Sequence, residues 1–455
     1  MNLHTLLRKR AAEGRPVTVG LIGAGKFGTM FLAKARTTVG LHVAAIADLA
    51  PDRARSNLAA CGWPADQYAA ASIEDAHHRG TTHITDSVEA VMAAPGIEVI
   101  VEATGDPKIG IGHCLQAIAA AKHIVMVNVE ADVVAGPLLA RRAEAAGVVY
   151  SLAYGDQPAL IAEHVDWARA CGFEVVAAGK GTRYLPRFHR STPETVWENF
   201  GLSPDKAARG GMNPKMFNSF IDGSKSGIEM TAVCNATGLT PQPDGLSFPP
   251  CASDDLANVC KPRDRGGVLT HKGTTEVVSS LNRDGTAVVH DLQMGTYVVV
   301  ECDHDYIRHC AEEYRMLPDR SFDHIALYRP IHLIGLETGI SVASAALRGE
   351  PTGRPVGFHS DAIATAKRAL KAGEMLDGEG GYCVWGKQVP ASRSLAEGLL
   401  PLGLAQGVKL RRDIGEGEQL RWSDVAIDES ELAVKIRREM EAAFGRANTA
   451  PQAAQ

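Results

Sequence analysis

Residues 17–28 have the sequence VTVGLIGAGKFG. An apolar run, residues 17–22, precedes three glycines in the pattern G-x-G-x-x-G, and residues 26–37 have the composition of a helix. The first glycine of such a turn permits a tight bend, the second leaves room for a pyrophosphate and the third lets the helix pack against the strand. Free N–H groups at the helix start then bind the phosphates. The stretch predicts a strand, a dinucleotide-binding turn and a helix.

The sequence after the turn favours a dinucleotide site over a glycine turn without a ligand. A second apolar run, residues 41–47, ends at Asp48. Asp48 lies about 20 residues after the last glycine of the turn, the position at which an acidic side chain hydrogen-bonds the adenosine ribose. The predicted cofactor contacts of this region are Gly23, Gly25, Lys26, Phe27, Gly28 and Asp48.

Apolar runs and helical patterns continue to alternate as far as Tyr150. Strand-like runs cover residues 97–105, 124–127 and 148–150, and helical patterns cover residues 113–121 and 137–146. This alternation predicts a parallel sheet with helices on both faces, the doubly wound α/β architecture of Rossmann domains.

Three residues at the ends of these runs are candidates for contact with the nicotinamide. Thr104 and Gly105 end one strand and Asn128 follows the next, which places them at the carboxyl edge of the sheet, where ligands bind. Each one taken alone is nearly as well explained as a turn residue.

The choice between NAD and NADP depends on residues near the end of the second strand. Asp48 would bind a free 2′-hydroxyl and repel a 2′-phosphate, which favours NAD(H). Arg53, with Arg55 close by, could hold that phosphate if Asp48 turned away. Both cofactors stay open at this point.

A lysine between two glycines is a candidate in the central region. A helical pattern over residues 157–171 and a strand over residues 174–178 lead to GKGTRY, residues 179–184. We expect Lys180 to be exposed on a flexible turn, where it could contact an anion or a carbonyl oxygen. A solvated lysine without a function is about as well supported.

The most informative central stretch is residues 210–238, GGMNPKMFNSFIDGSKSGIEMTAVCNATG. Asn213 followed by Pro214 is typical of a helix start with asparagine as the N-cap. One helix from there would carry five polar side chains on a single face, since they recur at steps of three and four residues. The five are Lys215, Asn218, Asp222, Lys225 and Glu229.

On spacing alone, this polar face is better explained as a solvent-exposed surface. Two observations favour a site. The face combines cations, carboxylates and an amide, which could hold a charged sugar-like substrate and move a proton. Gly223 and Gly227 also interrupt the predicted helix, where each glycine lowers helix stability by about 1 kcal/mol relative to alanine. Such a cost is easier to explain where another group approaches the backbone closely.

The rest of the chain is predicted as an α+β substrate domain followed by a small β-rich module. Strand-like runs at 267–269, 276–280 and 296–301 and a helical pattern at 330–347 belong to the first. A helix over 361–370, an extended segment over 371–377 and later turn glycines indicate the second. The predicted domains are 1–156, 157–352 and 353–445, with a disordered tail at 446–455.

Composition excludes several classes of protein. The net charge of −6 is modest and the basic residues are scattered, so no nucleic-acid partner is expected. No apolar run is long enough for a signal peptide or a membrane span, which predicts a cytoplasmic protein without a membrane partner. The nine cysteines form no C-x-x-C pair, which argues against structural zinc.

Several phrases together resemble a known family. Residues 19–31 and 42–49 resemble the cofactor domain of homoserine dehydrogenase-like proteins. Residues 371–387 and 400–420 resemble the SAF (antifreeze-like) domain. With the phrase at 210–238 between them, the chain resembles the deoxyxylulose-phosphate-reductoisomerase-like (DRL) family.

This resemblance implies conversion of 1-deoxy-D-xylulose 5-phosphate into 2-C-methyl-D-erythritol 4-phosphate with NADP(H), which feeds isoprenoid synthesis. The rearrangement passes through an alkoxide or enolate-like species, which cations or divalent Mg or Mn would stabilise. The implied catalytic residues are Lys180, Asp222, Lys225 and Glu229. The implied contacts to substrate and phosphate are Arg183, Lys215, Asn218 and Ser219. The sequence identifies no metal ligands.

Two other functions stay open. One is an NAD(P)-dependent dehydrogenase of another sugar phosphate, sugar acid or hydroxy acid, which would need no metal. The other is a cofactor-sensing regulatory protein that binds a ligand through the C-terminal module, although the charged central helix speaks against it. We expect a small phosphorylated sugar as substrate and a homodimer or higher homo-oligomer.

Overall fold

The structure is a computed structural model that describes residues 2–209 and 211–445. The tail predicted to be disordered, residues 446–455, lies outside the described residues. The chain divides into two compact units. Unit 1 comprises Met1–Leu160 and Leu333–Pro355, and unit 2 comprises Ile161–His332 and Val356–Gln455.

Unit 1 is built on a six-stranded sheet in the order β3-β2-β1-β4-β5-β6. All neighbouring strands run parallel, and the strand order reverses direction between β1 and β4. This order is that of Rossmann domains, so the predicted doubly wound α/β fold is confirmed. The strands are β1 Val17–Ile22, β2 Leu41–Ala47, β3 His83–Thr85, β4 Val99–Glu102, β5 His123–Met126 and β6 Tyr150–Leu152.

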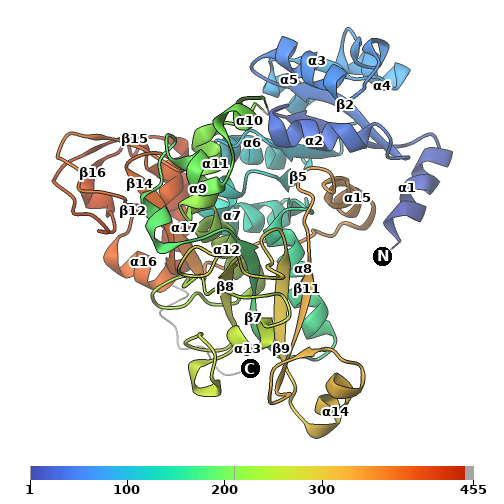
Figure 1. Cartoon of the computed structure of the whole chain (residues 1–455). Helices are drawn as coiled ribbons and strands as arrows, with labels where there is room; N and C mark the ends of the chain where they lie inside the picture. The colour runs from blue at the N-terminus through green and yellow to red at the C-terminus, as the bar shows by residue number, and fades with distance from the viewer. Residues whose placement is uncertain (1, 210, 446–455) are drawn as a thin grey trace. The chain divides into compact units, whose positions relative to one another are not determined.

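One face of this sheet is covered by a helix from a distant part of the sequence. Val19 and Leu21 of β1 share a core with Phe31 of α2 (Lys26–Ala35) and Val342 of α15 (Gly339–Arg348). Figure 1 shows α15 among the elements of unit 1, where it packs on β1, β4 and β5. The other helices of unit 1 are α1 Leu3–Ala12, α3 Pro51–Ala60, α4 Ile73–Arg79, α5 Val88–Ala93, α6 Pro107–Ala119 and α7 Val129–Ala145.

Two of these helices begin earlier than predicted. Helix α7 starts at Val129 rather than at Pro137, because the Asn128 side chain caps it by accepting a hydrogen bond from Ala131 N. Proline is common in a first helical turn and costly in a helix interior, which is why the sequence favoured the later start. Helix α6 likewise begins at Pro107.

The central part of unit 2 is a mixed five-stranded sheet in the order β10-β11-β9-β7-β8. Strand β7 is parallel to β8 and antiparallel to β9 (Figure 1). One face packs against helices α8 and α12, and the other against the segment 251–269. The strands are β7 Val175–Thr182, β8 Thr274–Ser279, β9 Thr296–Glu301, β10 Leu317–Pro318 and β11 His324–Arg329.

The long helix predicted after Asn213 is two helices. Helix α11 spans Pro214–Ile221 and α12 spans Ser224–Thr237. Gly223 between them has φ of 92°, a left-handed conformation that glycine adopts without strain. The five polar side chains predicted on one helix face therefore belong to three separate places, α11, the break and α12. The predicted cap is confirmed, since the Asn213 side chain accepts hydrogen bonds at the start of α11.

The C-terminal part of unit 2 is β-rich, as predicted, but it starts with a strand. Strand β12 (Ser360–Ala366) occupies most of the segment predicted as a helix over 361–370, and it pairs antiparallel with β14 (Val384–Pro390). Both strands pack against α12, and a Cβ on Gly227 would lie 2.5 Å from the backbone oxygen of Gly386. The close approach inferred from Gly227 is thus made by a strand of the same chain.

The remaining strands of unit 2 form a separate sheet, β13 Met375–Asp377, β15 Gln406–Leu410 and β16 Val425–Ala426. Its helices are α8 Gln157–Ala170, α9 Val196–Phe200, α10 Pro204–Arg209, α11, α12, α13 Leu256–Val259, α14 Asp305–Glu313, α16 Ala391–Glu397 and α17 Leu432–Gly445. In the described ranges, no helix combines the length and apolar character needed to cross a bilayer.

The two units divide the chain differently from the three predicted domains. Residues 333–355 pack with the cofactor sheet, because the apolar residues of α15 complete the core of unit 1. The segment predicted as a separate C-terminal module falls in the same unit as the central sheet. The predicted run over 267–269 forms only an isolated bridge, between Leu269 and Pro262. The helical pattern predicted from residue 330 begins only at Gly339.

Candidate functional site

The glycine turn between β1 and α2 has the close contacts that its sequence predicts. Gly23 has φ of 90°, and a Cβ there would lie 2.8 Å from Ala103 O. A Cβ on Gly28 would lie 2.2 Å from Gly23 O, so the helix can pack this closely only on a glycine. Gly25 is the N-cap of α2. Apart from Gly25 itself, its chain neighbours and the backbone of its own helix, no described heavy atom lies within 4 Å of its Cβ position. The turn therefore leaves space for a diphosphate at the positive end of the helix, beside the first helical residues Lys26 and Phe27.

Asp48 is held at the end of β2 by three donors. Its Oδ2 accepts a hydrogen bond from Ala24 N at 2.8 Å, and its Oδ1 accepts from Ala50 N at 2.8 Å and from Arg53 at 2.9 Å. The carboxylate is buried against the glycine turn, whereas the Arg53 side chain is 61% exposed. Asp48, which favours NAD(H), and Arg53, which favours NADP(H), are therefore paired with each other. The guanidinium of Arg53 is the better placed of the two to reach a ligand.

The carboxyl edge of the sheet carries a buried carboxylate that the sequence analysis did not single out. Glu102 Oε1 lies 3.3 Å from His113 Nδ1 and accepts hydrogen bonds from the N–H and hydroxyl of Thr104. Asn128 Nδ2 lies 3.5 Å from the Thr104 hydroxyl. The structure thus brings Thr104 and Asn128 together with Glu102, and Gly105 follows with φ of 75°. Contact of these residues with the nicotinamide stays a prediction.

A second buried carboxylate lies one helical turn after Asn128 on α7. Asp132 Oδ1 accepts a hydrogen bond from the Tyr150 hydroxyl at 2.7 Å, and both residues are buried. Burial raises the pKa of Asp132 to about 7. Burial and the nearby Asp132 charge also raise the pKa of Tyr150 well above its ordinary value. Unit 1 therefore holds a carboxyl group that can exchange a proton near neutral pH.

The prediction that Lys180 lies on an exposed turn is wrong. Lys180 lies inside strand β7 and is buried. A Cβ on Gly179 would lie 1.8 Å from Glu276 O, and a Cβ on Gly181 would lie 1.9 Å from Leu292 O. The two glycines that suggested a turn are therefore needed because neighbouring backbone approaches the strand closely.

The side chain of Lys180 pairs with Glu229 of α12. The two side chains are only 6% and 3% exposed. Removing one partner of such a buried pair leaves an uncompensated charge, which is strongly unfavourable. Each residue therefore holds the other in place. An ammonium group bonded to a carboxylate can also donate or hold a proton. The structure thus brings together two of the four predicted catalytic residues.

Polar groups from neighbouring elements lie close to this pair. Thr296 of β9 is opposite Lys180 in the sheet register, and its hydroxyl lies 3.1 Å from Nε2 of His164 on α8. Burial lowers the pKa of His164 to about 4, so the ring is neutral at physiological pH. Lys225, one turn before Glu229 on α12, is also buried. This side of the sheet therefore combines an ammonium–carboxylate pair with a neutral imidazole and a hydroxyl.

Asp222 is paired with a lysine that the sequence analysis missed. Asp222 Oδ2 lies 2.7 Å from Lys367 Nζ, and Oδ1 accepts a hydrogen bond from Ser224 N at 2.8 Å. Lys367 follows β12 and also donates to Ser191 O at 2.7 Å and to Gly381 O at 2.6 Å. The Lys367 and Asp222 side chains are 2% and 0% exposed. These contacts fix the break between α11 and α12, and a catalytic role for Asp222 stays a prediction.

The residues predicted to bind the substrate make contacts of their own. Lys215 and Asn218 donate hydrogen bonds to backbone carbonyls within residues 377–380, and Ser219 donates to a carbonyl of its own helix. Arg183 is half-buried and donates to a backbone carbonyl at 2.8 Å. These contacts join α11 to the C-terminal part of unit 2, and binding of the substrate by these residues is untested.

A second group missed from the sequence surrounds His189. His189 Nδ1 lies 2.7 Å from the backbone oxygen of Asp222 and therefore donates to it, which leaves Nε2 to accept from the Tyr184 hydroxyl at 2.8 Å. The imidazole stacks on Trp385 with ring centroids 3.8 Å apart. Burial lowers the pKa of His189 and raises that of Tyr184 to about 12. Both groups are therefore neutral, and they brace the backbone of Asp222.

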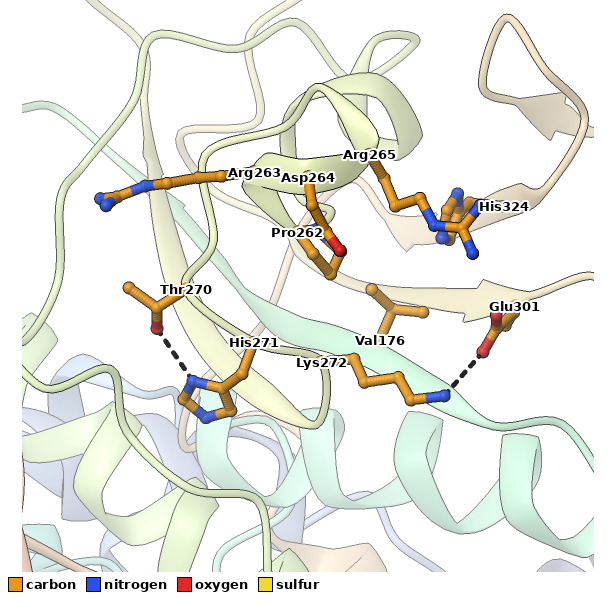
Figure 2. Close-up of a pocket in the computed structure, with 10 residues that line it drawn as sticks. All are labelled: Val176, Pro262, Arg263, Asp264, Arg265, Thr270, His271, Lys272, Glu301 and His324. Carbon is orange, nitrogen blue, oxygen red and sulfur yellow. Dashed lines mark hydrogen bonds and ion pairs between the residues drawn. The ribbon is translucent and has the colours of Figure 1, made fainter.

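A cavity of about 470 Å³ opens near Val176, at the start of β7, and does not include the predicted site residues (Figure 2). In Figure 2 the Lys272 side chain points to Glu301, and its Nζ lies 3.1 Å from that carboxylate and 2.8 Å from Glu174. Lys180 lies four residues further along the strand, about 13 Å away at the usual rise. The other charged side chains that line the cavity are Arg263, Asp264, Arg265, His271 and His324.

The carboxylates of the candidate site do not fit a divalent metal ion. Glu229 and Asp222 are each paired with a lysine ammonium group. Within residues 2–209 and 211–445, no group of three His, Cys, Asp or Glu side chains is arranged to hold a metal. The Mg or Mn that the resemblance implies therefore has no ligand set here, and we assign no step to it.

Comparison with protein families places this geometry in a class. Residues 19–152 match the model described as homoserine dehydrogenase, NAD binding domain. Together with the Rossmann sheet and its glycine turn, this match identifies residues 19–152 as a nicotinamide-dinucleotide-binding domain of the kind that oxidoreductases carry. Residues 155–338 match the model described as oxidoreductase DRL, catalytic domain. The predicted resemblance to the DRL family is therefore confirmed.

Comparison with solved structures finds distant similarities. A myo-inositol dehydrogenase from Lactobacillus casei in complex with NAD(H) and myo-inositol is 14% identical, with 40% of this chain and 50% of that chain covered and a TM-score of 0.27. A myo-inositol dehydrogenase from Corynebacterium glutamicum is 14% identical, with 40% and 48% covered and a TM-score of 0.27. The chain spans 43% to 50% of the length of the first three solved structures that it matches. No curated protein matches the chain.

Proposed function

We propose that the protein is an NAD(P)H-dependent reductoisomerase that converts 1-deoxy-D-xylulose 5-phosphate into 2-C-methyl-D-erythritol 4-phosphate. The observation that carries this proposal is the buried Lys180–Glu229 pair within the region that matches the DRL catalytic domain. The pair offers a positive charge and a proton acceptor side by side, and the reaction needs both.

The first half of the reaction rearranges the carbon skeleton and places negative charge on oxygen. The Lys180 ammonium would stabilise that charge, and Glu229 would hold the proton released by a neighbouring hydroxyl. Lys225, one turn before Glu229, would add positive charge on the same side of α12. Arg183, Lys215, Asn218 and Ser219 are the proposed contacts to the substrate and its phosphate.

The second half reduces the rearranged aldehyde. The nicotinamide, when bound, would supply the hydride for this step. Lys180 would donate a proton to the carbonyl oxygen. The open space at Gly25 favours the glycine turn as the site of the diphosphate. Thr104, Gly105 and Asn128 would lie beside the nicotinamide. Glu102, which holds Thr104, would fix that edge.

We propose NADP(H) as the preferred cofactor. Asp48 is already engaged by two backbone N–H groups, whereas the guanidinium of Arg53 is exposed and could meet a 2′-phosphate. The preference is tested by titrating both cofactors by fluorescence. Arg53→Ala should weaken NADPH binding more than NADH binding.

The function is tested by following NADPH oxidation at 340 nm with deoxyxylulose phosphate and identifying the product by mass spectrometry. Lys180→Met should lower kcat by roughly 10²–10⁴, the usual contribution of a positioned proton donor. Lys272→Met is the matched control, because this exposed lysine pairs with two glutamates on the same sheet. A folded protein without turnover would contradict the proposal.

The second candidate is a dehydrogenase of another sugar phosphate, sugar acid or hydroxy acid. The observation that favours it is the lack of a three-residue metal ligand set within the described residues. It predicts cofactor turnover with such a substrate, without skeletal rearrangement of the product. A panel of sugar phosphates and sugar acids, each with NADH and NADPH, separates the two candidates.

A further inference from the structure

The geometry points to a metal-free site, in which the ammonium group of Lys180 takes the place of a divalent cation as the group that polarises the substrate oxygen. This inference rests on the proposed function for its substrate. It rests on two buried ion pairs of unit 2, Lys180–Glu229 and Lys367–Asp222, for everything else. Magnesium is usually held by one or two carboxylates together with waters and substrate oxygens, so the state of the available carboxylates decides the question.

The first carboxylate, that of Glu229, is already paired with an ammonium group. Glu229 bonds to the Lys180 ammonium, and both side chains are almost completely withdrawn from water. A dication on Glu229 would have to displace that ammonium or lie within a few ångströms of it. In a buried setting such like-charge repulsion is weakly screened.

The second carboxylate is paired as well, with the ammonium group of Lys367. Lys367 Nζ lies 2.7 Å from Asp222 Oδ2 and donates hydrogen bonds to Ser191 O at 2.7 Å and to Gly381 O at 2.6 Å. Two of its three N–H donors are thus used by backbone carbonyls, which hold the positive charge beside Asp222. Because Lys367 directly follows β12, which packs on α12, a metal on Asp222 would have to lie next to this fixed ammonium group or displace it.

Lys180 is in turn fixed well enough to act on a substrate. Its backbone lies in the middle of β7, between two glycines that press against neighbouring backbone. Electrostatic stabilisation is strongest where the charge is held in advance by rigid elements. Lys180 Nζ would donate one proton to the carbonyl oxygen as the carbonyl carbon receives the hydride, which yields a hydroxyl and a neutral amine. The amine would then regain its proton from solvent.

The decisive experiment is a titration of the full-length protein with Mn²⁺, followed by electron paramagnetic resonance, in the presence of NADP⁺. We expect no Mn²⁺ binding that depends on Glu229 or Asp222. Stoichiometric binding that Glu229→Gln or Asp222→Asn removes would overturn the inference. This readout needs no substrate, so it stands even if deoxyxylulose phosphate is not turned over and the proposed function fails.

A second measurement uses turnover with whichever substrate the panel identifies. We expect EDTA to change kcat by less than about twofold, because no metal takes part. Loss of turnover in EDTA that Mn²⁺ or Mg²⁺ restores would contradict the inference. Lys180→Arg keeps the charge and should retain more activity than Lys180→Met. Far-UV circular dichroism and thermal unfolding confirm that each variant is folded.

Discussion

At the scale of a single residue, the burial of Asp132 makes the free energy of unfolding depend on pH. Its pKa rises from 3.8 to about 7, so the native state retains a proton that the unfolded state has already released between these values. The free energy of unfolding therefore falls as pH rises from about 4 to about 7, by at most about 4 kcal/mol at about 1.4 kcal/mol per pKa unit. Asp132→Asn should remove this slope, because the amide does not titrate but can still accept from Tyr150. Urea unfolding of both proteins at about pH 5 and about pH 8 measures the slope. Equal pH dependence in the two proteins would show that Asp132 is charged in the native state.

Single residues also show which parts of the site could be predicted. The roles of Gly23 and Gly28 follow from a local rule about one turn, and their contacts agree with it. The burial of Lys180 depends on backbone from Glu276 and Leu292, far along the chain, which no local pattern reveals. Lys367 was missed for the same reason, since only the folded sheet brings it to Asp222.

At the scale of an element, the contact between α12 and β14 depends on Gly227. A methyl group there would lie 2.5 Å from Gly386 O, so the helix and the strand would have to separate. Gly227→Ala should lower the free energy of unfolding by about 1–3 kcal/mol, the usual cost of overpacking, despite the higher helix propensity of alanine. Thermal unfolding measures the change. Gly415→Ala is the control, because a Cβ there would lie 3.5 Å from the flexible side chain of Glu418, and it should change stability by less than about 0.5 kcal/mol. A neutral Gly227→Ala would mean that the two elements are not tightly packed.

Elements differ in how far the sequence predicts them. The sheet of unit 1 could be predicted because each strand is a buried apolar run followed by a helix. Strand β12 could not, since its SDAIATA sequence is rich in alanine, a strong helix former, and pairing with β14 overrides that preference. The break at Gly223 was also missed, because the polar spacing continues across it.

At the scale of the whole molecule, a buried ion pair joins the break between α11 and α12 to the C-terminal part of unit 2. Lys367→Met should lower the free energy of unfolding by about 3–5 kcal/mol, because it leaves the buried Asp222 carboxylate without its ammonium. Adding Asp222→Asn should recover part of the loss. The exposed pair of Lys371 with Asp413 provides the control, and Lys371→Met should cost less than about 1 kcal/mol. Denaturant unfolding of the four proteins tests this, and a small effect of Lys367→Met would mean that the C-terminal strands contribute little to unit 2. The packing of residues 333–355 within unit 1 could not be predicted, since it depends on the assembled sheet.

We propose that the buried Lys180–Glu229 pair serves an NAD(P)-dependent reaction on a sugar phosphate. The most direct measurement is NADPH oxidation with deoxyxylulose phosphate by the full-length protein, with product identification, for the wild type, Lys180→Met and Lys272→Met. We predict formation of methylerythritol phosphate by the wild type and by Lys272→Met, and a roughly 10²–10⁴-fold lower kcat for Lys180→Met. Equal activity of all three proteins, or the absence of this product from a protein that binds NADPH, would contradict the account.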